Sequence, residues 1–166
     1  RYEFVTGVQT CALPIWTYLE TADAVIAAEM ADNAVAYAAA VQASVPAGTL
    51  QWRGFLPTAQ LQAELGWCRA LLNTPKWNEA YGNVLVEAMA CGVPVLAYRR
   101  GGPGELVQPG VNGWLVAPDD VTALAEALEQ VERIDRNACR HWVERHASRE
   151  VLAQRIEAWL EQGLQP

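Results

Sequence analysis

Residues 79–94, with the sequence EAYGNVLVEAMACGVP, decide the fold of this chain. The segment opens on a polar loop, passes through Gly82 and enters a run of Val, Leu, Glu, Ala and Met that favours a helix. Gly92 is typical of a helix end, and the apolar residues 93–98, VPVLAY, have the composition of a strand that is buried on both faces. A loop, a helix and a buried strand in this order are typical of one repeat of a parallel α/β sheet.

Short apolar strands continue to alternate with helices on both sides of this segment. Strands are predicted at residues 49–55, 69–73, 93–98 and 114–116. Helices are predicted at residues 21–43, 58–66, 83–91, 121–132, 134–146 and 148–161, with a helical turn at residues 104–107. We therefore expect an α/β fold built on a Rossmann-like parallel sheet with helices on both faces. In such a sheet, ligands bind beyond the carboxyl ends of the strands.

The composition is that of a globular domain and excludes several classes of partner. The chain has 166 residues, of which 52% are hydrophobic and 19% charged, and its net charge is −7. Its 12 Lys and Arg residues form no basic stripe, so we expect no nucleic-acid partner. No apolar run is long enough for a transmembrane segment. The four cysteines are Cys11, Cys68, Cys91 and Cys139. Their spacing does not match that of metal ligands, and we expect a protein of the reducing cytoplasm.

Residues 1–15, RYEFVTGVQTCALPI, do not follow the pattern of the rest of the chain. They contain no charged segment followed by an apolar one, as a signal peptide would. The stretch VTGVQTCALPI resembles translated sequencing-adaptor read-through at the end of an open reading frame. We therefore expect an artefactual leader at residues 1–15 and a partial domain at residues 16–166. The alternative is a true strand, because Leu13 and Ile15 are suited to burial.

Glu79 and Glu87 flank Gly82, with seven residues between the two glutamates. In one continuous helix they would point about 80° apart, so we expect Glu79 on the loop and Glu87 on the helix that follows. Gly82 allows the backbone to approach a ligand closely, and the free N–H groups at the helix start favour a phosphate. Carboxylates accept hydrogen bonds from sugar hydroxyls, so a nucleotide-sugar suits this arrangement. On spacing alone, solvated or capping glutamates remain the alternative.

A longer pattern extends over residues 75–120, PKWNEAYGNVLVEAMACGVPVLAYRRGGPGELVQPGVNGWLVAPDD. It resembles the donor-binding half of retaining glycosyltransferases with the GT-B fold, of the large family 4/group 1 type. The family's motif positions are matched by Glu79, Tyr81, Gly82, Glu87, Ala88, Met89, Ala90, Cys91, Gly92, Pro94, Gly101, Gly102, Glu105, Gly110, Gly113, Pro118 and Asp119. The resemblance covers residues 51–128 and implies that residues 16–166 are a truncated GT-B half-domain that binds a nucleotide-sugar.

The resemblance also implies roles for individual residues. Glu79 would be the catalytic residue, holding hydroxyls of the transferred sugar, and Glu87 would bind the ribose hydroxyls. The further donor contacts implied are Tyr81, Gly82, Asn83, Val84 and Leu85, the last two through N–H groups that meet the diphosphate. Sugar would be transferred from a nucleoside-diphosphate-sugar with retained configuration, and no metal or other cofactor would be needed.

Three basic residues near this pattern are candidate phosphate contacts. Lys76 stands where the family commonly has a small serine, and it would reach either a phosphate or solvent. Arg99 and Arg100 follow the strand predicted at residues 93–98, and one of them would face the diphosphate. The alternative is a solvated pair at a turn.

Two features of the family pattern are missing from the chain. The sequence contains no GRxxxxKG run for clamping the donor diphosphate and no acceptor-binding N-terminal domain, which we expect as the partner within the parent protein. We therefore expect the parent to be an enzyme and the chain alone to be inert. The alternative function is a non-catalytic nucleotide-binding or scaffolding module. A dehydrogenase would need a G-x-G-x-x-G after the first strand, and a glycosidase would need both glutamates to face one bond.

Overall fold

The computed structural model describes residues 56–163 continuously, together with residues 5–6 and isolated positions between residues 36 and 53. The chain divides into two compact units, of which the first combines Arg1–Gly7 with Thr58–Pro166 and the second is Val8–Pro57. In the second unit the described alanines at 36, 39, 40 and 43 are helical, as predicted for residues 21–43. The strand predicted at residues 49–55 lies outside the described residues, apart from Arg53.

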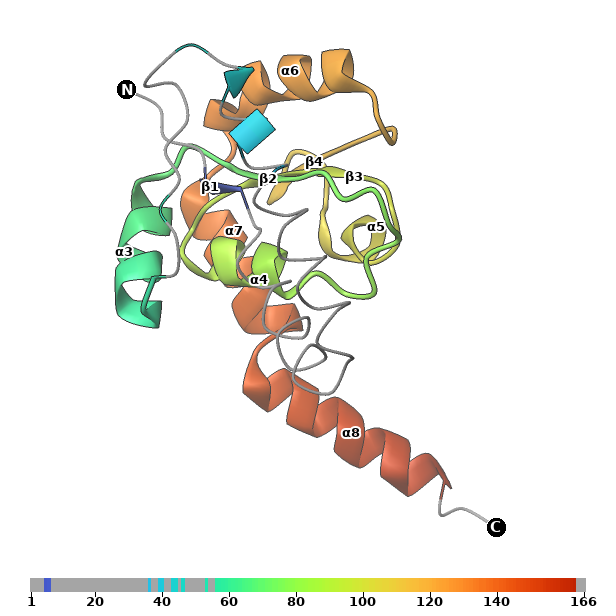
Figure 1. The fold of residues 1–166 in the computed structure, drawn as a ribbon. Helices are drawn as coiled ribbons and strands as arrows, with labels where there is room; N and C mark the ends of the chain where they lie inside the picture. The colour runs from blue at the N-terminus through green and yellow to red at the C-terminus, as the bar shows by residue number, and fades with distance from the viewer. Residues whose placement is uncertain are drawn as a thin grey trace, which may run out of the picture. The chain divides into compact units, whose positions relative to one another are not determined.

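The described elements of the first unit alternate between strands and helices (Figure 1). The strands are β1 Val5–Thr6, β2 Leu71–Asn73, β3 Val95–Tyr98 and β4 Gly113–Val116. The helices are α3 Thr58–Trp67, α4 Asn83–Ala90, α5 Pro103–Leu106, α6 Val121–Gln130, the short 3-10 helix η1 Val131–Arg133, α7 Arg136–His146 and α8 Arg149–Gly163. Each element predicted between residues 58 and 161 is therefore present, with ends that differ by a few residues.

The strands form one parallel sheet in the order β1-β2-β3-β4. In the register of this sheet, Leu71 of β2 lies beside Val95 of β3, which in turn lies beside Gly113 of β4. The predicted α/β fold with a parallel sheet is confirmed. The β1 strand falls within residues 1–15, and the origin of that stretch stays a prediction.

Two apolar clusters cover the two faces of the sheet, and β3 contributes to both because its side chains alternate. Val95 and Ala97 pack in the larger cluster with α4 and α7, whereas Leu96 packs in the smaller cluster with α6. All four β3 residues are buried, as the run VPVLAY predicts. Figure 1 shows α6 on one side of the sheet and α4 and α7 on the other. The predicted helices on both faces are therefore present.

Helix α3 is fastened at its C-terminal end by an arginine from α7. The Arg136 guanidinium donates from Nη1 to the Cys68 carbonyl at 3.0 Å and from Nη2 to the Gly66 carbonyl at 2.8 Å. The last carbonyls of a helix have no partners within it, so a cation placed there both satisfies and stabilises them. α3 therefore owes part of its position to a residue about 70 positions later in the chain.

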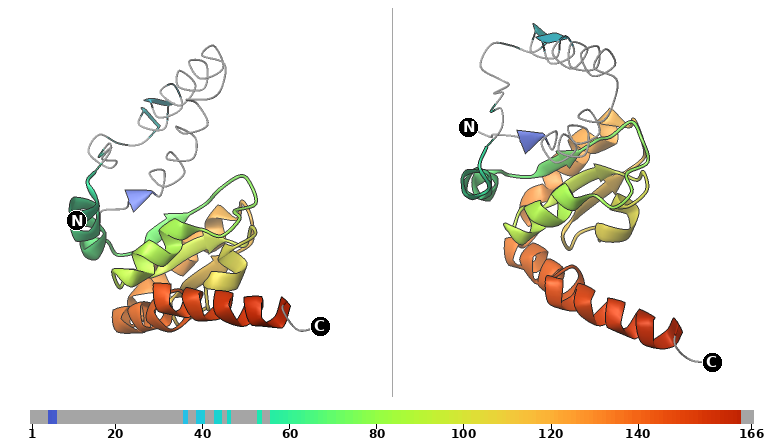
Figure 2. Two further views of the ribbon diagram at one scale, coloured as in Figure 1. Left: turned by 90° about the horizontal axis from the view of Figure 1, so that it is seen from below. Right: turned by 60° about the horizontal axis from the view of Figure 1, so that its bottom comes forward.

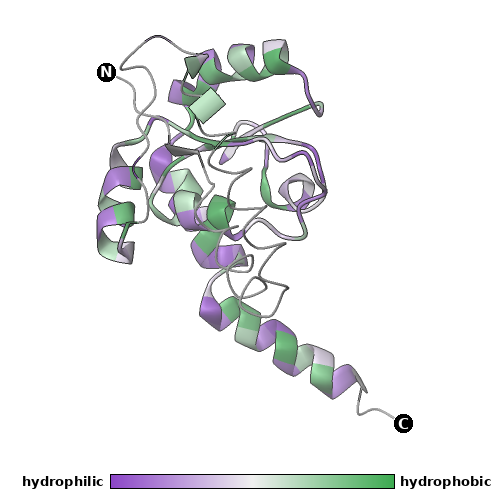
Figure 3. Ribbon diagram, viewed as in Figure 1, coloured by the Kyte–Doolittle hydropathy of each residue, from purple (hydrophilic) through white to green (hydrophobic). Residues whose placement is uncertain are grey.

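Helix α8 continues from α7 to the C-terminal end of the chain (Figures 1 and 2). Ser148 Oγ accepts from the Val151 N–H at 3.3 Å near its start. Large apolar residues recur along the helix, as Figure 3 shows in green, and four of them are exposed within the described structure: Leu152, Ile156, Trp159 and Leu160. No helix among the described residues combines the length and apolar character that crossing a membrane requires.

Candidate functional site

Three loops leave the carboxyl ends of β2, β3 and β4, at residues 74–82, 99–102 and 117–120. Because these strands are parallel neighbours, all three loops emerge at the same edge of the sheet. We call residues 74–82 the glutamate loop, since it carries Glu79 and ends at the start of α4.

The glutamate loop is joined to the loop after β3 by backbone contacts. The Glu79 N–H donates to the Arg100 carbonyl at 3.2 Å, and the Gly102 N–H donates to the Glu79 carbonyl at 2.7 Å. A Cβ on Gly101 would lie 2.2 Å from the Glu79 carbonyl oxygen, and one on Gly102 would lie 2.3 Å from the Tyr81 carbonyl oxygen. The Gly-Gly pair therefore allows an approach between the two loops that no side chain would permit.

Gly82 forms the junction between the glutamate loop and α4. Its φ of +95° lies in the left-handed region, which glycine adopts without steric cost. The Leu85 N–H donates to the Gly82 carbonyl at 2.9 Å, so this predicted phosphate donor already has an internal partner. Within the described part of the chain, the N–H groups of Asn83 and Val84 have no acceptor. These two amides at the helix start are the donors available to an anion.

One exposed aromatic ring contacts the half-buried side chain of Glu79, and a second exposed aromatic residue follows it in the sequence. The Trp77 indole N–H donates to Glu79 Oε2 at 3.4 Å, and 56% of the Trp77 surface is exposed. Tyr81, two residues after Glu79, is 46% exposed. Trp77 was missed by the sequence analysis, although an aromatic residue two positions before the candidate carboxylate could have indicated it.

Glu87 lies on α4, one turn beyond the free amides at the helix start. The residue is largely exposed, yet the part of its carboxyl that the surrounding protein shields from water raises the pKa of that carboxyl. Glu79 therefore lies on the glutamate loop and Glu87 on α4, as their spacing predicts.

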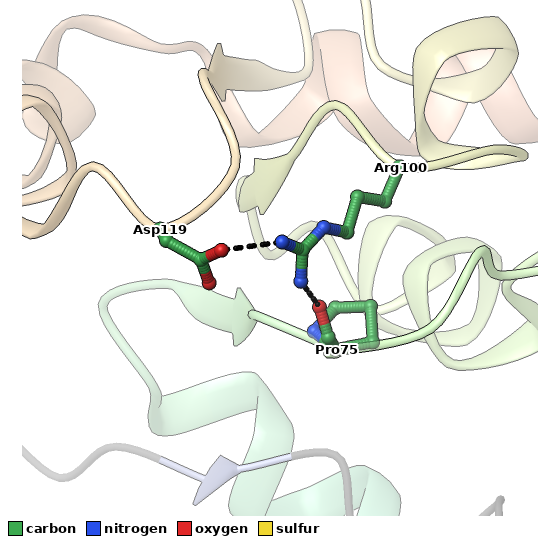
Figure 4. A network of polar contacts seen from close by, with 3 residues as sticks. All are labelled: Pro75, Arg100 and Asp119. Carbon is green, nitrogen blue, oxygen red and sulfur yellow. Dashed lines mark hydrogen bonds and ion pairs between the residues drawn. The ribbon is translucent and has the colours of Figure 1, made fainter.

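The three basic candidates differ in their surroundings. Lys76 and Arg99 are exposed, and neither has an ion-pair partner among the residues described here. The Arg100 guanidinium donates from Nη1 to the Pro75 carbonyl at 2.8 Å and from Nη2 to Asp119 Oδ2 at 2.5 Å, as Figure 4 shows. We call these three residues the Arg100 network. It links all three loops at this edge, and sequence reasoning gave no indication of the Pro75 and Asp119 contacts.

The site therefore combines a carboxylate with neighbouring aromatic rings, free amides at a helix start and a set of basic residues. Such groups suit a ligand that carries both hydroxyls and a phosphate. Across the described residues, no group of three or more His, Cys, Asp or Glu side chains is arranged to hold a metal ion.

Comparisons with known proteins give the chain its family. The profile of the family described as glycosyl transferases group 1 matches residues 37–149, which is more than half of the chain. A sucrose synthase from Acidithiobacillus caldus is 36% identical over 101 residues, which cover 58% of this chain and 13% of that protein. The alpha-1,3/1,6-mannosyltransferase alg-2 from Neurospora crassa is 42% identical over 76 residues, covering 46% of this chain and 16% of that protein. The chain thus spans less than one fifth of either relative.

A solved structure gives the same result for the fold. The crystal structure of Anabaena Alr3699/HepE in complex with UDP and glucose is similar with a TM-score of 0.55 and 25% sequence identity. The similarity covers 69% of this chain and 33% of that one. The chain belongs to the glycosyl transferases group 1 family, and its fold is that of a GT-B half-domain.

Proposed function

We propose that this chain is the donor-binding part of a glycosyltransferase, which transfers a sugar from a nucleoside-diphosphate-sugar with retention of configuration. One observation carries this function: around Gly82, the loop that holds the Glu79 carboxylate leads directly into the unpartnered N–H groups of Asn83 and Val84. A carboxylate accepts from sugar hydroxyls, and amides at a helix start donate to a diphosphate. The similarity to a protein solved with UDP and glucose supports the same class of ligand.

In the proposed reaction, the bond between the anomeric carbon and the diphosphate oxygen breaks, and negative charge develops on the departing diphosphate. The free amides and the positive end of α4 stabilise this charge, and Lys76 or Arg99 adds to it if the side chain turns inward. Glu79 accepts hydrogen bonds from the sugar hydroxyls and so orients the reacting carbon. Glu87 accepts from the ribose hydroxyls, and no metal or other cofactor takes part.

The remaining proposed contacts complete the donor site. Tyr81, Gly82 and Asn83 contact the sugar, mainly through the backbone. The Leu85 N–H already donates to the Gly82 carbonyl, so it contributes at most a shared hydrogen bond to the diphosphate. No residue of this set is assigned to an acceptor. We therefore propose that the chain binds the donor without completing transfer, and that transfer needs an acceptor-binding domain in the parent protein. Formation of a glycosylated product by the chain alone, with donor and mixed acceptors, would contradict this.

Isothermal titration of the chain with UDP, UDP-glucose, GDP and GDP-mannose tests donor binding. One sugar nucleotide is expected to bind more tightly than its parent diphosphate, and Glu79→Gln is expected to remove the sugar's share, a loss of roughly tenfold. Glu87→Ala is expected to lower the affinity for the diphosphate and for its sugar form equally. We expect that addition of EDTA does not change the binding. If no sugar adds affinity in the wild-type chain, a non-catalytic nucleotide-binding module is the better description.

A further inference from the structure

Arg100 holds the glutamate loop at two places. Its carbonyl accepts from the Glu79 N–H at 3.2 Å, and its guanidinium donates to the Pro75 carbonyl at 2.8 Å. Pro75 and Glu79 bound the segment that carries Lys76, Trp77 and Asn78. One residue at the end of β3 therefore contacts both ends of the segment that positions the candidate catalytic carboxylate.

We propose that Arg100 is a positioning residue for Glu79 and does not bind the donor phosphate. This role rests on the proposed function in one respect, because Glu79 is taken to hold the donor sugar. The charge of the guanidinium faces the Asp119 carboxylate, and both Nη atoms have protein acceptors. A phosphate ligand at Arg100 would have to compete with these partners.

The chemistry of the Arg100 network requires an arginine. A planar guanidinium donates in two fixed directions at once, toward Pro75 and toward Asp119, whereas a lysine ammonium is a single point of charge on a flexible stem. Only 18% of the Arg100 side chain is exposed, and the guanidinium carbon lies 5.9 Å from the centre of the Tyr98 ring. The Asp119 side chain, in contrast, is 61% exposed, so solvent screens this ion pair and the Arg100 side chain is held mainly by its geometry.

The backbone of Asp119 gives independent support. Its φ is +65°, and it is the one residue other than glycine with a positive φ among those that the structure describes. This conformation costs a residue with a Cβ some strain, although aspartate tolerates it better than most. In this conformation the Asp119 carboxylate accepts from Arg100, while the adjacent Asp120 caps α6 by accepting from the Ala123 N–H at 2.9 Å. Two neighbouring aspartates therefore have separate tasks.

The first test needs no ligand. Hydrogen exchange of the chain measures the amide of Glu79 and its neighbours in Arg100→Gln, with Arg140→Gln as the matched control. Arg140 forms an exposed ion pair with Glu144 at 3.0 Å on α7, so its loss removes an arginine pair away from the site. Arg100→Gln is expected to speed exchange of the Glu79 amide, which donates to the Arg100 carbonyl, roughly tenfold, and Arg140→Gln to leave it unchanged. Unchanged exchange in Arg100→Gln would overturn the positioning role, whatever the chain binds.

The second test separates positioning from phosphate binding by titrating the chain with UDP and UDP-glucose, or with GDP and GDP-mannose if the wild-type chain binds that pair. For the UDP pair, Arg100→Gln is expected to lower the affinity for UDP-glucose roughly tenfold and to change the affinity for UDP by less than about twofold, because only the sugar contact through Glu79 is disturbed. Equal losses for both ligands would assign Arg100 to the diphosphate and overturn the inference. Arg100→Lys is expected to restore part of the loss at most. If Arg100→Gln does not fold, Asp119→Asn replaces it in both tests, with the same pattern and smaller changes expected.

Failure of the proposed function would look different. In that case neither UDP-glucose nor GDP-mannose would bind the wild-type chain more tightly than its parent diphosphate, and Glu79→Gln would change nothing. The exchange result for the Glu79 amide would still decide whether Arg100 holds the loop.

Discussion

Gly101 and Glu79 approach so closely that a Cβ on Gly101 would lie 2.2 Å from the Glu79 carbonyl oxygen. Gly101 also has a φ of +71°, in the left-handed region. Gly101→Ala is therefore expected to lower the free energy of unfolding by about 2–4 kcal/mol, because it adds both left-handed strain and a backbone clash. Urea unfolding followed by circular dichroism measures the change.

Gly104 provides the matched control for this substitution. It lies in α5, and the nearest atom to a Cβ placed there is Arg99 Cγ at 3.8 Å. Gly104→Ala is expected to change the free energy of unfolding by less than about 1 kcal/mol. Equal effects at the two positions would show that the close approach of the loops is not what requires glycine.

The raised pKa of the Glu87 carboxyl predicts a pH-dependent effect on stability. Burial raises this pKa above its ordinary value of 4.5, so the folded chain holds a proton at pH values where the unfolded chain has lost it. The stability therefore falls as the pH rises through this window, and the cost of the charged carboxylate is fully present above it. Glu87→Gln is expected to raise the free energy of unfolding at pH 7 by less than about 1 kcal/mol, since solvent screens a group this exposed.

The same comparison at low pH tests the cause. Below the ordinary carboxyl pKa, Glu87 is protonated in both states, so the difference between the wild type and Glu87→Gln is expected to disappear. Urea unfolding at a series of pH values gives the two curves. A constant difference at every pH would point to packing and not to ionisation.

Asp120 provides the N-cap of α6, which packs on the smaller apolar cluster. Its Oδ1 accepts from the Ala123 N–H at 2.9 Å, one of the amides that a helix start leaves unpaired. Asp120→Ala is expected to lower the free energy of unfolding by about 1 kcal/mol, and Asp120→Ser to recover most of it. The same loss in both variants would indicate that the charge of Asp120, and not its capping bond, is what stabilises α6.

The buried thiols predict a pattern of alkylation. Burial raises the pKa of Cys139 to about 11, so at pH 8 almost none of this thiol is the reactive thiolate. Cys91 is only half-buried, although burial also raises its pKa. With iodoacetamide and peptide mass spectrometry, Cys91 is expected to react slowly, Cys139 to stay unmodified, and both to react in urea. Rapid labelling of Cys139 in the folded chain would show that α7 opens readily.

The fold could be predicted because the sequence features that define its helices and strands are local. Gly82 and Gly92 bracket α4, and both have positive φ, a backbone conformation that glycine adopts without steric cost. The four buried residues of β3 lie in a run that has no charged side chain. The helix predicted at residues 58–66 is likewise present as α3, with Leu65 buried. Patterns of this kind depend on neighbours within a few positions, so the sequence shows them directly.

The site was only partly predictable, because several of its contacts depend on how distant segments meet. The Arg100 partners lie 25 and 19 positions away, and one of them is a carbonyl, which has no sequence signature. Asp119 and Asp120 both precede α6, and residue type alone does not decide which of them caps it. The positive φ of Asp119 decides between them, and that conformation is set by the loop as a whole.

The contact of Arg136 with the end of α3 constrains the order in which this unit is assembled during synthesis. The carbonyls of Gly66 and Cys68 leave the ribosome 70 and 68 positions before the guanidinium that binds them. A nascent chain that stops before α7 therefore lacks both of these hydrogen bonds to the end of α3, however complete its β2 and β3 strands are. During translation, the C-terminal end of α3 can be fixed in this way only after α7 has been synthesised.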